Sequence, residues 1–363
     1  MTRVAVAGAT GQVGQLVVTA LRDAGHEPVE LSRARGVDVL AGDGLAEALT
    51  GADAVIDVLN TAATDPDETI SFFGRTSDNL LSAGQRCGVR HHVLLSIVNV
   101  DGVPDNAHYL GKVAQEQRVE AGLVPRIILR ATQFHSFAEM VAGWTAEAGE
   151  ATVAPLLVQP VDVGDVAAVL TELALGEPQG RAPDLAGPDT MGLVDMAVRT
   201  FAARGDATRV RASWRDSPFG LSMAGEVLLP GAGARIGDTS FTDWLARDAG
   251  DPRSLAIAYF EAWLAHDFGR LRALLADEAT FRGPLGSADS GDECVAGLPG
   301  MTKIMTGLQI TLMVVDGPDV MAWYDLLTGN APPAPTVNWM HVEDGKIAQI
   351  RATFDPRAIL GIS

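Results

Sequence analysis

The stretch RVAVAGATGQVGQLVVTALRDAGHEPVELSR, residues 3–33, decides the fold of the first part of the chain. It begins with a short buried strand over Val4–Ala7 and continues with three glycines at three-residue spacing. Apolar residues then recur with the period of an α-helix as far as Gly25, and PVELSR predicts a second strand. Strand, glycine turn, helix and strand in this order indicate one βαβ unit.

The glycine turn is typical of a dinucleotide-binding site. Its first glycine allows a tight bend, its second lets the backbone approach a pyrophosphate, and its third lets the helix pack closely against the strand. The phosphates would lie on the free N–H groups of the helix N-terminus. The residues predicted to contact the cofactor here are Gly8, Thr10, Gly11, Gln12, Val13 and Gly14.

The end of the second strand bears on the choice of cofactor. NAD-binding units usually carry an acidic residue there for the ribose hydroxyl, whereas this chain has Ser32 and Arg33. Because a guanidinium can bind a 2′-phosphate, the sequence favours NADPH. Glu30 lies close by, so NADH stays possible.

Further strands alternate with helical stretches along the first 250 residues, and they end near Asn60, Val98 and Phe134. This alternation predicts an α/β fold of Rossmann type, a doubly wound parallel sheet with helices on both faces. Ligands of such sheets bind at the carboxyl ends of the strands. We therefore expect Asn60, Ser96 and Thr132 near the cofactor.

The composition restricts the partners. A formal charge of −19 over 363 residues opposes binding to a phosphate backbone or an anionic membrane, so neither nucleic acid nor membrane is expected. The start shows no signal peptide, which predicts a cytoplasmic protein. Cys87 and Cys294 stand far apart and suggest neither a disulfide nor a metal site.

Residues 1 to about 250 resemble the NmrA-like, atypical branch of the short-chain dehydrogenases/reductases. The resemblance is carried by GATGQVG, LLSIVNVDG, GKVAQEQRVEAGLVPRIILRATQFH and PVDVGDVAAVL. It implies either a reductase of small carbonyls or alkenes that uses NADPH, or a nucleotide sensor without turnover. It also implies that the segment SWRDSPFGLSMAGEVLLPG covers the substrate.

The stretch NAHYLGKVAQE, residues 106–116, departs from the tyrosine and lysine pair that typical members place one helical turn apart. At 100° per residue, Lys112 and His108 lie about 40° apart, whereas Tyr109 lies about 60° to the other side of the lysine. A branch that resembles isoflavone reductases works with the lysine alone. We expect Lys112 to contact the cofactor first of all; Lys112 with Ser96 as catalytic residues comes second, and His108 or Tyr109 as proton donor third.

The pattern changes at Asp251-Pro252, where a new helix begins, and this predicts a domain boundary after residue 250. Helices followed by strands, with a hairpin at Asp344-Gly345, make residues 251–363 similar to the SnoaL-like group of the NTF2-like fold. The motifs are AYFEAWLAHDFGRLRALLADEATFRGPLG and VNWMHVEDGKIAQIRATFDPR. The resemblance implies an α+β domain around one cone-shaped pocket.

Within this domain Tyr259 matches the oxyanion-stabilising tyrosine of related isomerases, but Gly283 stands where they carry their base. If Val342 pairs with Ile347, strand alternation places the next group of residues on one face, which the resemblance makes the interior. These are Val337, Trp339, His341, Ile350, Ala352 and Phe354, with Asn338, Gln349 and Arg351 pointing outward. His341 is then an interior candidate, and Asp325 a second one whose facing stays open.

Three functions follow. The first is an NAD(P)H-dependent reductase of a small or medium apolar carbonyl or conjugated substrate, which the resemblance links to bacterial secondary metabolism. The second is a non-redox cyclase, isomerase or hydrolase that works with Tyr259, Asp325 and His341, while the first domain serves as scaffold or NADP(H) sensor. A binding protein without catalysis is the third. We expect a small-molecule substrate and a possible homodimer.

Overall fold

The computed structural model describes residues 1–302, 305–329 and 331–357. Contacts divide the chain into unit 1, which is Met1–Val198 with Arg209–Trp244, and unit 2, which is Arg199–Thr208 with Leu245–Ser363. The division in this region precedes the predicted boundary after residue 250, and it falls within the helices α7 (Leu193–Ala203) and α8 (Phe241–Ala249). No helix in the described residues is long and apolar enough to cross a membrane.

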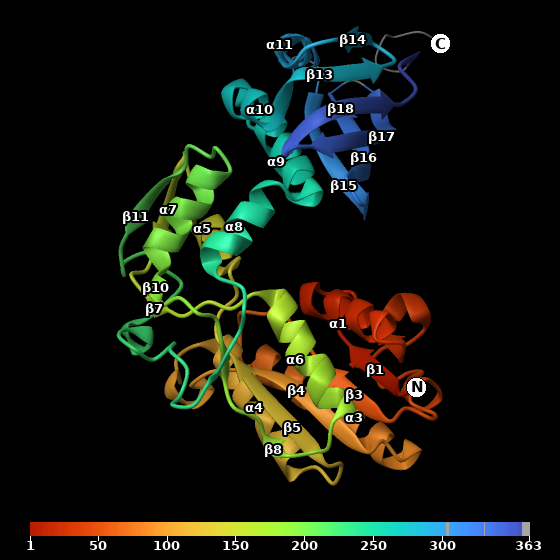
Figure 1. The fold of residues 1–363 in the computed structure, drawn as a ribbon, viewed down its shortest axis with the longest axis vertical. Helices are drawn as coiled ribbons and strands as arrows, with labels where there is room; N and C mark the ends of the chain where they lie inside the picture. Colours follow the sequence, from red (N-terminus) through yellow and green to blue (C-terminus); the bar gives the residue numbers. More distant parts are fainter. Residues whose placement is uncertain (303–304, 330, 358–363) are drawn as a thin grey trace. The chain divides into compact units, whose positions relative to one another are not determined.

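Unit 1 is built on a parallel sheet of Rossmann type with the strand order β12-β9-β5-β4-β3-β1-β2, and β8 also pairs with β5 (Figure 1). The core of its central strands is apolar and fully buried, as the short runs of valine, alanine and isoleucine predict. The strands are β1 (Arg3–Ala7), β2 (Glu27–Leu31), β3 (Ala54–Asp57), β4 (His91–Ile97), β5 (Arg126–Ala131), β8 (Gly180–Arg181), β9 (Leu185–Ala186) and β12 (Arg235–Ile236).

Helices cover both faces of this sheet, which confirms the doubly wound arrangement. One face packs against α1 (Gln12–Asp23) and α6 (Val163–Leu175). The other packs against α2 (Leu45–Ala48), α3 (Pro66–Cys87) and α4 (Ala107–Ala121). The helix α4 carries the candidate residues His108, Tyr109 and Lys112, and their positions relative to the sheet decide what they can do.

The sheet reverses its winding between β1 and β3, because β2 lies on one side of β1 and all later strands lie on the other. Parallel sheets bind ligands at such a point, beyond the carboxyl ends of the strands. Gly8 occupies this place with φ +88°, in the left-handed region that favours glycine. A Cβ on Gly8 would also lie 2.9 Å from the carbonyl oxygen of Val58, which follows β3.

Smaller elements complete unit 1. Short strands pair β6 with β11 and β7 with β10, outside the main sheet. The elements are η1 (Arg33–Arg35), η2 (Val100–Gly102), α5 (Phe137–Thr145), β6 (Glu150–Val153), β7 (Leu157–Val158), β10 (Met191–Gly192), β11 (Arg209–Ala212) and η3 (Leu221–Met223).

Unit 2 packs its helices against one face of a sheet with the order β14-β13-β18-β17-β16-β15. Neighbouring strands are antiparallel except β13 and β18. Its first helix begins as predicted at Asp251, whose carboxylate accepts the Ser254 N–H at 2.8 Å. The elements are α9 (Pro252–Leu264), α10 (Phe268–Leu274), β13 (Leu275–Gly283), β14 (Gly286–Ala288), α11 (Gly291–Ala296), α12 (Leu298–Thr302), β15 (Met305–Asp316), β16 (Asp319–Thr328), β17 (Ala331–Glu343) and β18 (Lys346–Thr353).

The predicted hairpin between β17 and β18 is confirmed. Asp344 and Gly345 have φ values of 50° and 70°, as a two-residue hairpin turn of type I′ requires. Val342 pairs with Ile347, but the next pair is His341 with Gln349. Ala348 is therefore an extra residue in β18, and this β-bulge changes which residues of β17 share a face with which residues of β18.

The close contact of α1 with β1 gives a test of the fold. A Cβ on Gly14 would lie 2.1 Å from the Gly8 carbonyl oxygen, so we expect Gly14→Ala to lower the stability of unit 1 by about 1–3 kcal/mol or more. Gly143→Ala is the control, since Gly143 lies in α5 with nothing within 4 Å of its added Cβ. We expect calorimetry to show that the unfolding temperature of this control is unchanged or slightly raised. Equal unfolding temperatures for both variants would contradict the packing described.

Candidate functional site

The N-terminus of α1 is open to a ligand. Gly11 caps this helix with extended backbone, and no side chain accepts a hydrogen bond from its first turn. Thr10, Gly11 and Gln12 are exposed, whereas Val13 and Gly14 are buried against the sheet. The backbone N–H groups of the first turn thus remain available to an anionic group, which is what a pyrophosphate requires.

Ser32 and Arg33 follow β2 and do not continue the strand, since Arg33 begins the short helix η1. Arg33 is exposed, and the described residues offer it no ion pair. Glu30, by contrast, is held by Arg22 at 2.5 Å. Arg33 thus has a guanidinium that no ion pair of the described residues occupies, whereas the Glu30 carboxylate already pairs with Arg22. This end of β2 therefore suits a 2′-phosphate better than a ribose hydroxyl.

Lys112 lies under α4 against the sheet and is only 5% exposed. Its Nζ donates to the Leu95 carbonyl oxygen at 2.7 Å and, over a short contact, to Oε1 of Gln115. The ammonium also lies 4.9 Å from the centre of the Phe73 ring. Two of the three ammonium hydrogens thus have hydrogen-bond partners within the protein.

A buried carboxylate balances this ammonium. Gln115 links the two, because its Nε2 donates to Oδ2 of Asp57 at 3.0 Å. Burial alone would raise the pKa of Asp57, but His92, whose Nε2 lies 3.7 Å from Oδ2 of Asp57, and the charge of Lys112 leave it below the usual value. Burial lowers the pKa of Lys112 to about 8, although Asp57 and Glu116 oppose this shift.

Tyr109 also lies under α4, and it points to a different place. Its hydroxyl accepts a hydrogen bond from Nε2 of Gln133 at 3.3 Å, and burial raises its pKa. No hydrogen bond joins the Tyr109 and Lys112 side chains in the described residues. Oε1 of Gln133 and Oγ of Ser96 are both buried without a partner, at the ends of the neighbouring strands β5 and β4. Such atoms call for a ligand or a water.

His108 packs against Phe73, with the two ring centres 5.6 Å apart. Burial, and then the charge of Lys112, lower the pKa of His108 to about 4. The imidazole is therefore neutral at pH 7, and this argues against the suggestion that His108 donates a proton at neutral pH. The reason is desolvation, which a position near a helix start did not reveal.

The side chains of Asn60 and Thr132 differ in exposure and in their hydrogen-bond partners. Asn60 follows β3 and is exposed, and its side chain accepts the N–H of Thr61 at 2.9 Å. Thr132 follows β5 and is buried, and its hydroxyl already donates to the Gln159 carbonyl oxygen at 2.6 Å. Both lie at the expected edge of the sheet, but the Thr132 hydroxyl has its partner within the protein.

The segment that the sequence predicts to cover the substrate, residues 213–231, is tied to the loop after β4. Asn99, in the left-handed region with φ 48°, donates from Nδ2 to the carbonyl oxygens of Val227 and Leu229 at 2.8 and 3.0 Å. Ser222 donates to Asp105 at 2.5 Å. The segment thus packs beside the loop that leads from Ser96 to α4.

In unit 2 the structure does not bring Tyr259, Asp325 and His341 together. Tyr259 lies in the core between α9 and the sheet and is 4% exposed. The residues of β16 alternate, and Tyr324 and Leu326 face the core, so Asp325 faces away from it. The facing of Asp325, which the sequence leaves open, is therefore outward, and its carboxylate lies on the outer face opposite Pro335 of β17.

His341 also lies on the outer face, and the prediction of an interior His341 is wrong. Ala334, Thr336, Asn338, Met340 and Val342 are the buried residues of β17, so Val337, Trp339 and His341 face outward. His341 contacts Asp319 through Nδ1 at 2.9 Å. The assignments of Ile350 to the interior, and of Gln349 and Arg351 to the outside, are confirmed. The bulge at Ala348 explains why only the β17 residues were misassigned.

The interior of unit 2 instead holds a different polar set. Asn338 is 2% exposed, and its Oδ1 has no partner, nor has Nε1 of the buried Trp263. Tyr324 lies close to Asn338, while burial raises its pKa. The Tyr259 and Trp263 ring centres are 6.3 Å apart. A buried amide oxygen and a buried indole N–H without partners among the described residues each call for a ligand or an ordered water.

Comparison with known proteins agrees with this division. Residues 8–174 match the family model described as NAD(P)H-binding, and residues 256–350 match that of the SnoaL-like domain. The chain joins an NAD(P)H-binding domain to a SnoaL-like domain. A search of curated proteins gives no match.

Among solved structures, dTDP-4-dehydrorhamnose reductase from Bacillus anthracis in complex with NADP is 17% identical, covering 68% of this chain and 98% of that chain with a TM-score of 0.55. A short-chain dehydrogenase/reductase superfamily protein from Agrobacterium tumefaciens with bound NAD is also 17% identical, covering 68% and 95% with a TM-score of 0.50. An NTF2-like protein of unknown function from Cytophaga hutchinsonii is 23% identical, covering 30% and 95% with a TM-score of 0.28. The first two show the fold alone.

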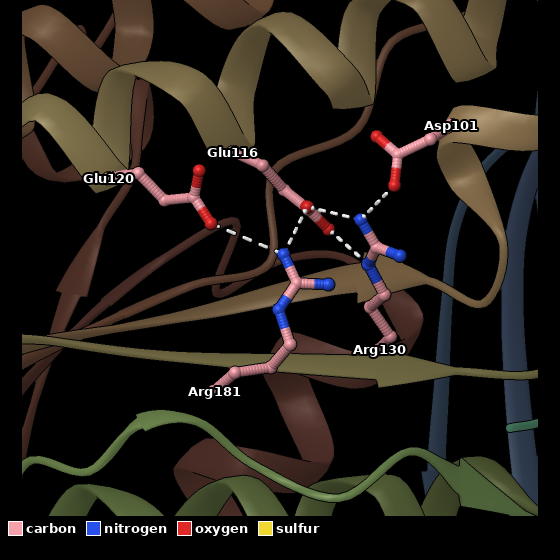
Figure 2. A network of polar contacts seen from close by, with 5 residues as sticks. All are labelled: Asp101, Glu116, Glu120, Arg130 and Arg181. Carbon is pink, nitrogen blue, oxygen red and sulfur yellow. Dashed lines mark hydrogen bonds and ion pairs between the residues drawn. The ribbon is translucent and has the colours of Figure 1, made fainter. Parts of the chain in front are cut away.

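The α4 helix of the NAD(P)H-binding domain is fixed by a network of charges (Figure 2). Arg130 of β5 donates to both carboxylate oxygens of Glu116, at 2.8 and 2.7 Å, and to Asp101 at 2.7 Å. Arg181 donates to Glu116 at 3.1 Å and to Glu120 at 3.2 Å. Because Glu116 lies one helical turn after Lys112, this network fixes the part of α4 that carries the lysine.

Several of these residues were not predicted from the sequence: Asp57, His92, Gln115, Gln133 and Asn338. Asp57 gave a signal, since it is a carboxylate in the apolar run AVIDV. Gln115 stands three residues after Lys112 and so lies on the same side of the helix. Gln133 and Asn338 gave none, because their partners come from distant parts of the chain.

The charge network yields a prediction. Glu116→Gln leaves the buried Arg130 without its main partner, so we expect the NAD(P)H-binding domain to lose about 3 kcal/mol of stability. Glu120→Gln is the matched control, since Glu120 is about half exposed and its loss should cost less than about 1 kcal/mol. Calorimetry at one protein concentration measures both. A loss from Glu120→Gln as large as that from Glu116→Gln would show that burial does not decide the effect.

Proposed function

We propose that the protein is an NADPH-dependent reductase of a small or medium apolar carbonyl or conjugated substrate. One observation carries the proposal: Lys112, with a pKa near 8, lies on the strand ends where Ser96 and Gln133 have buried atoms without partners. These groups lie in the NAD(P)H-binding domain, at the edge where parallel sheets of this type bind ligands. A place in bacterial secondary metabolism belongs to the same proposal and rests on the resemblance of the sequence.

The residues present suit a dinucleotide. The glycine turn and the uncapped N-terminus of α1 would hold its pyrophosphate, Arg33 its 2′-phosphate, and the third ammonium hydrogen of Lys112 its ribose or the substrate. When bound, the nicotinamide supplies a hydride.

Lys112 is the group best suited to proton transfer near neutral pH. An acid works best when its pKa lies near the working pH, and the value of about 8 meets this condition. Tyr109 holds its proton more firmly than an ordinary tyrosine, and the imidazole of His108 is neutral. We therefore assign proton donation to Lys112, with Ser96 in a position to orient the substrate oxygen.

A second candidate function rests on the SnoaL-like domain. The unpartnered atoms of Asn338 and Trp263 suit a ligand with one donor and one acceptor in an otherwise apolar body. A non-redox reaction there would not use Asp325 or His341, which lie on the outer face. Tyr259 and Tyr324 then add two buried phenolic hydroxyl groups to this interior.

Titration with NADPH and NADH, followed by nicotinamide fluorescence, tests the first proposal. We expect binding by the wild-type chain and its loss in Gly11→Asp, which adds a charge where the pyrophosphate would lie. Oxidation of NADPH with a panel of quinones, enones and aldehydes then tests turnover. Binding without oxidation would support either a reaction in the SnoaL-like domain or a nucleotide sensor without turnover. Absence of binding would refute both the reductase and the sensor.

The cofactor preference depends on Arg33. We expect Arg33→Ala to weaken NADPH binding about 10- to 100-fold, because a hydrogen-bonded arginine and phosphate pair is lost, and to leave NADH binding unchanged. Arg35→Ala is the matched control, since Arg35 is similarly exposed but lies 3.9 Å from Glu30. Fluorescence titration measures all four combinations. An equal loss for both nucleotides would exclude the 2′-phosphate role.

The pKa of Lys112 gives a pH dependence. Below pH 8 the ammonium is charged and attracts the nucleotide, and above pH 8 it loses its proton. We expect the dissociation constant for NADPH to stay level from pH 7 to 8 and then to rise by up to about tenfold per pH unit. In Lys112→Met the constant should be higher at pH 7 and level throughout. A wild-type profile that stays level to pH 9.5 would rule out this contact.

A further inference from the structure

Gln133 lies two residues after the end of β5, and its side chain has no assigned part in the reaction proposed above. Gln133 is only 8% exposed. Its Nε2 donates to the Tyr109 hydroxyl at 3.3 Å, whereas its Oε1 is buried without a partner among the described residues. Leaving a buried amide oxygen without a hydrogen bond is costly, so this atom calls for a bound donor.

Tyr109 orients the Gln133 amide. Because the hydroxyl oxygen of Tyr109 accepts a hydrogen of Nε2, the carbonyl end of the amide is directed away from the tyrosine. Burial raises the pKa of Tyr109, so the hydroxyl keeps its proton throughout the physiological pH range and remains a neutral neighbour of the amide. Tyr109, which has no hydrogen bond to Lys112, thus contacts the site through Gln133.

A second buried atom without a partner, Oγ of Ser96, lies on the neighbouring strand β4 (Figure 1). Ser96 pairs with Arg130 in the sheet, and Gln133 stands three residues further along the chain. At about 3.3 Å per residue, the two backbone positions lie roughly 10 Å apart along the strands. A single ligand that reaches both side chains therefore needs two polar atoms with several bonds between them.

The two groups differ in what they can bind. A serine hydroxyl can donate to a carbonyl oxygen, as the proposed reduction requires, whereas an amide oxygen only accepts. A ligand that satisfies both has a carbonyl at one end and a hydroxyl or N–H group at the other. A plain aldehyde, enone or quinone would leave Oε1 of Gln133 unpaired, and a site with an unpaired buried polar group rejects such an analogue.

We propose that Gln133 determines substrate specificity: its Oε1 accepts a hydrogen bond from a hydroxyl or N–H group that the substrate carries several bonds from its carbonyl. The substrate class is thus a hydroxylated or amino-substituted carbonyl compound. Gln133 contacts the substrate directly, and Tyr109 is a positioning residue that acts through it. The inference rests on the proposed reductase function, since that function places the carbonyl at Ser96.

Calorimetric titration of the full chain in excess NADP⁺ tests the proposal without turnover. One probe is a naphthoquinone with a hydroxyl group on its second ring; its methyl ether and unsubstituted naphthoquinone lack the donor. We expect the wild type to bind the hydroxyl compound at least about tenfold more tightly than the other two, because one buried hydrogen bond separates them. Gln133→Met should bind all three equally, with its affinity for NADPH unchanged.

Two further variants separate recognition from structure. Gln159→Met is the matched control, because the Gln159 amide already donates to the Gly187 carbonyl oxygen at 2.7 Å, and it should keep the full preference. Tyr109→Phe keeps Oε1 but removes the partner of Nε2, so its preference should fall to about threefold. In turnover, Gln133→Met should raise KM for the hydroxyl compound and leave kcat unchanged, as the loss of uniform binding does. Circular dichroism reports whether each variant folds.

The proposal is overturned if the wild type binds the three probes equally or binds none, or if the preference survives in Gln133→Met. A loss of NADPH affinity in Gln133→Met as large as the loss for the hydroxyl compound would assign Oε1 to the nucleotide and overturn it too. Failure of the reductase function gives a different result, namely the expected preference without oxidation of NADPH. If Gln133→Met does not fold, the reduced or full preference of Tyr109→Phe decides in its place.

Discussion

The charge of Lys112 has to be compensated inside the protein, and much of the NAD(P)H-binding domain follows from this requirement. The ammonium lies between α4 and the sheet, where an apolar layer is the rule. Asp57 supplies the opposite charge at the end of β3, and Gln115 carries the hydrogen bonding between them. The neighbouring pair of Glu116 and Arg130 fixes the helix, so a buried polar layer connects three strands with α4.

Where the sequence permits only one local structure, the fold was predictable. The turn at Gly8 and the contact of Gly14 leave no room for a side chain, so these positions specify the first βαβ unit almost by sterics alone. The hairpin at Asp344-Gly345 was predictable for a similar reason, because both turn positions need a positive φ, which few residues adopt. Tyr109 and Lys112 bond to different groups, but the helical angle between them does not explain this, since Gln115 stands at the same three-residue spacing and bonds to Lys112.

The parts that were not predictable depend on single-residue irregularities or on distant partners. No residue near Ala348 marks it as a bulge, yet the bulge reverses the facing of His341 and Asn338 relative to β18. Desolvation decides the proton affinity of His108, and it comes from packing against α3 rather than from its neighbours in sequence. Gln133 and Tyr109 meet only because β5 and α4 are neighbours in the folded domain.

A shift of one residue in the pairing of β17 with β18 decides which side chains of β17 share a face with the buried residues of β18. β17 carries two alternating sets: Thr336, Asn338 and Met340 on one side, Val337, Trp339 and His341 on the other. Insertion or deletion of one residue in β18 would change which set lies beside Ile350 without altering any residue of β17. A length change in one strand is thus a route by which a domain of this kind could bring a different set of side chains into its interior, without any new side chain.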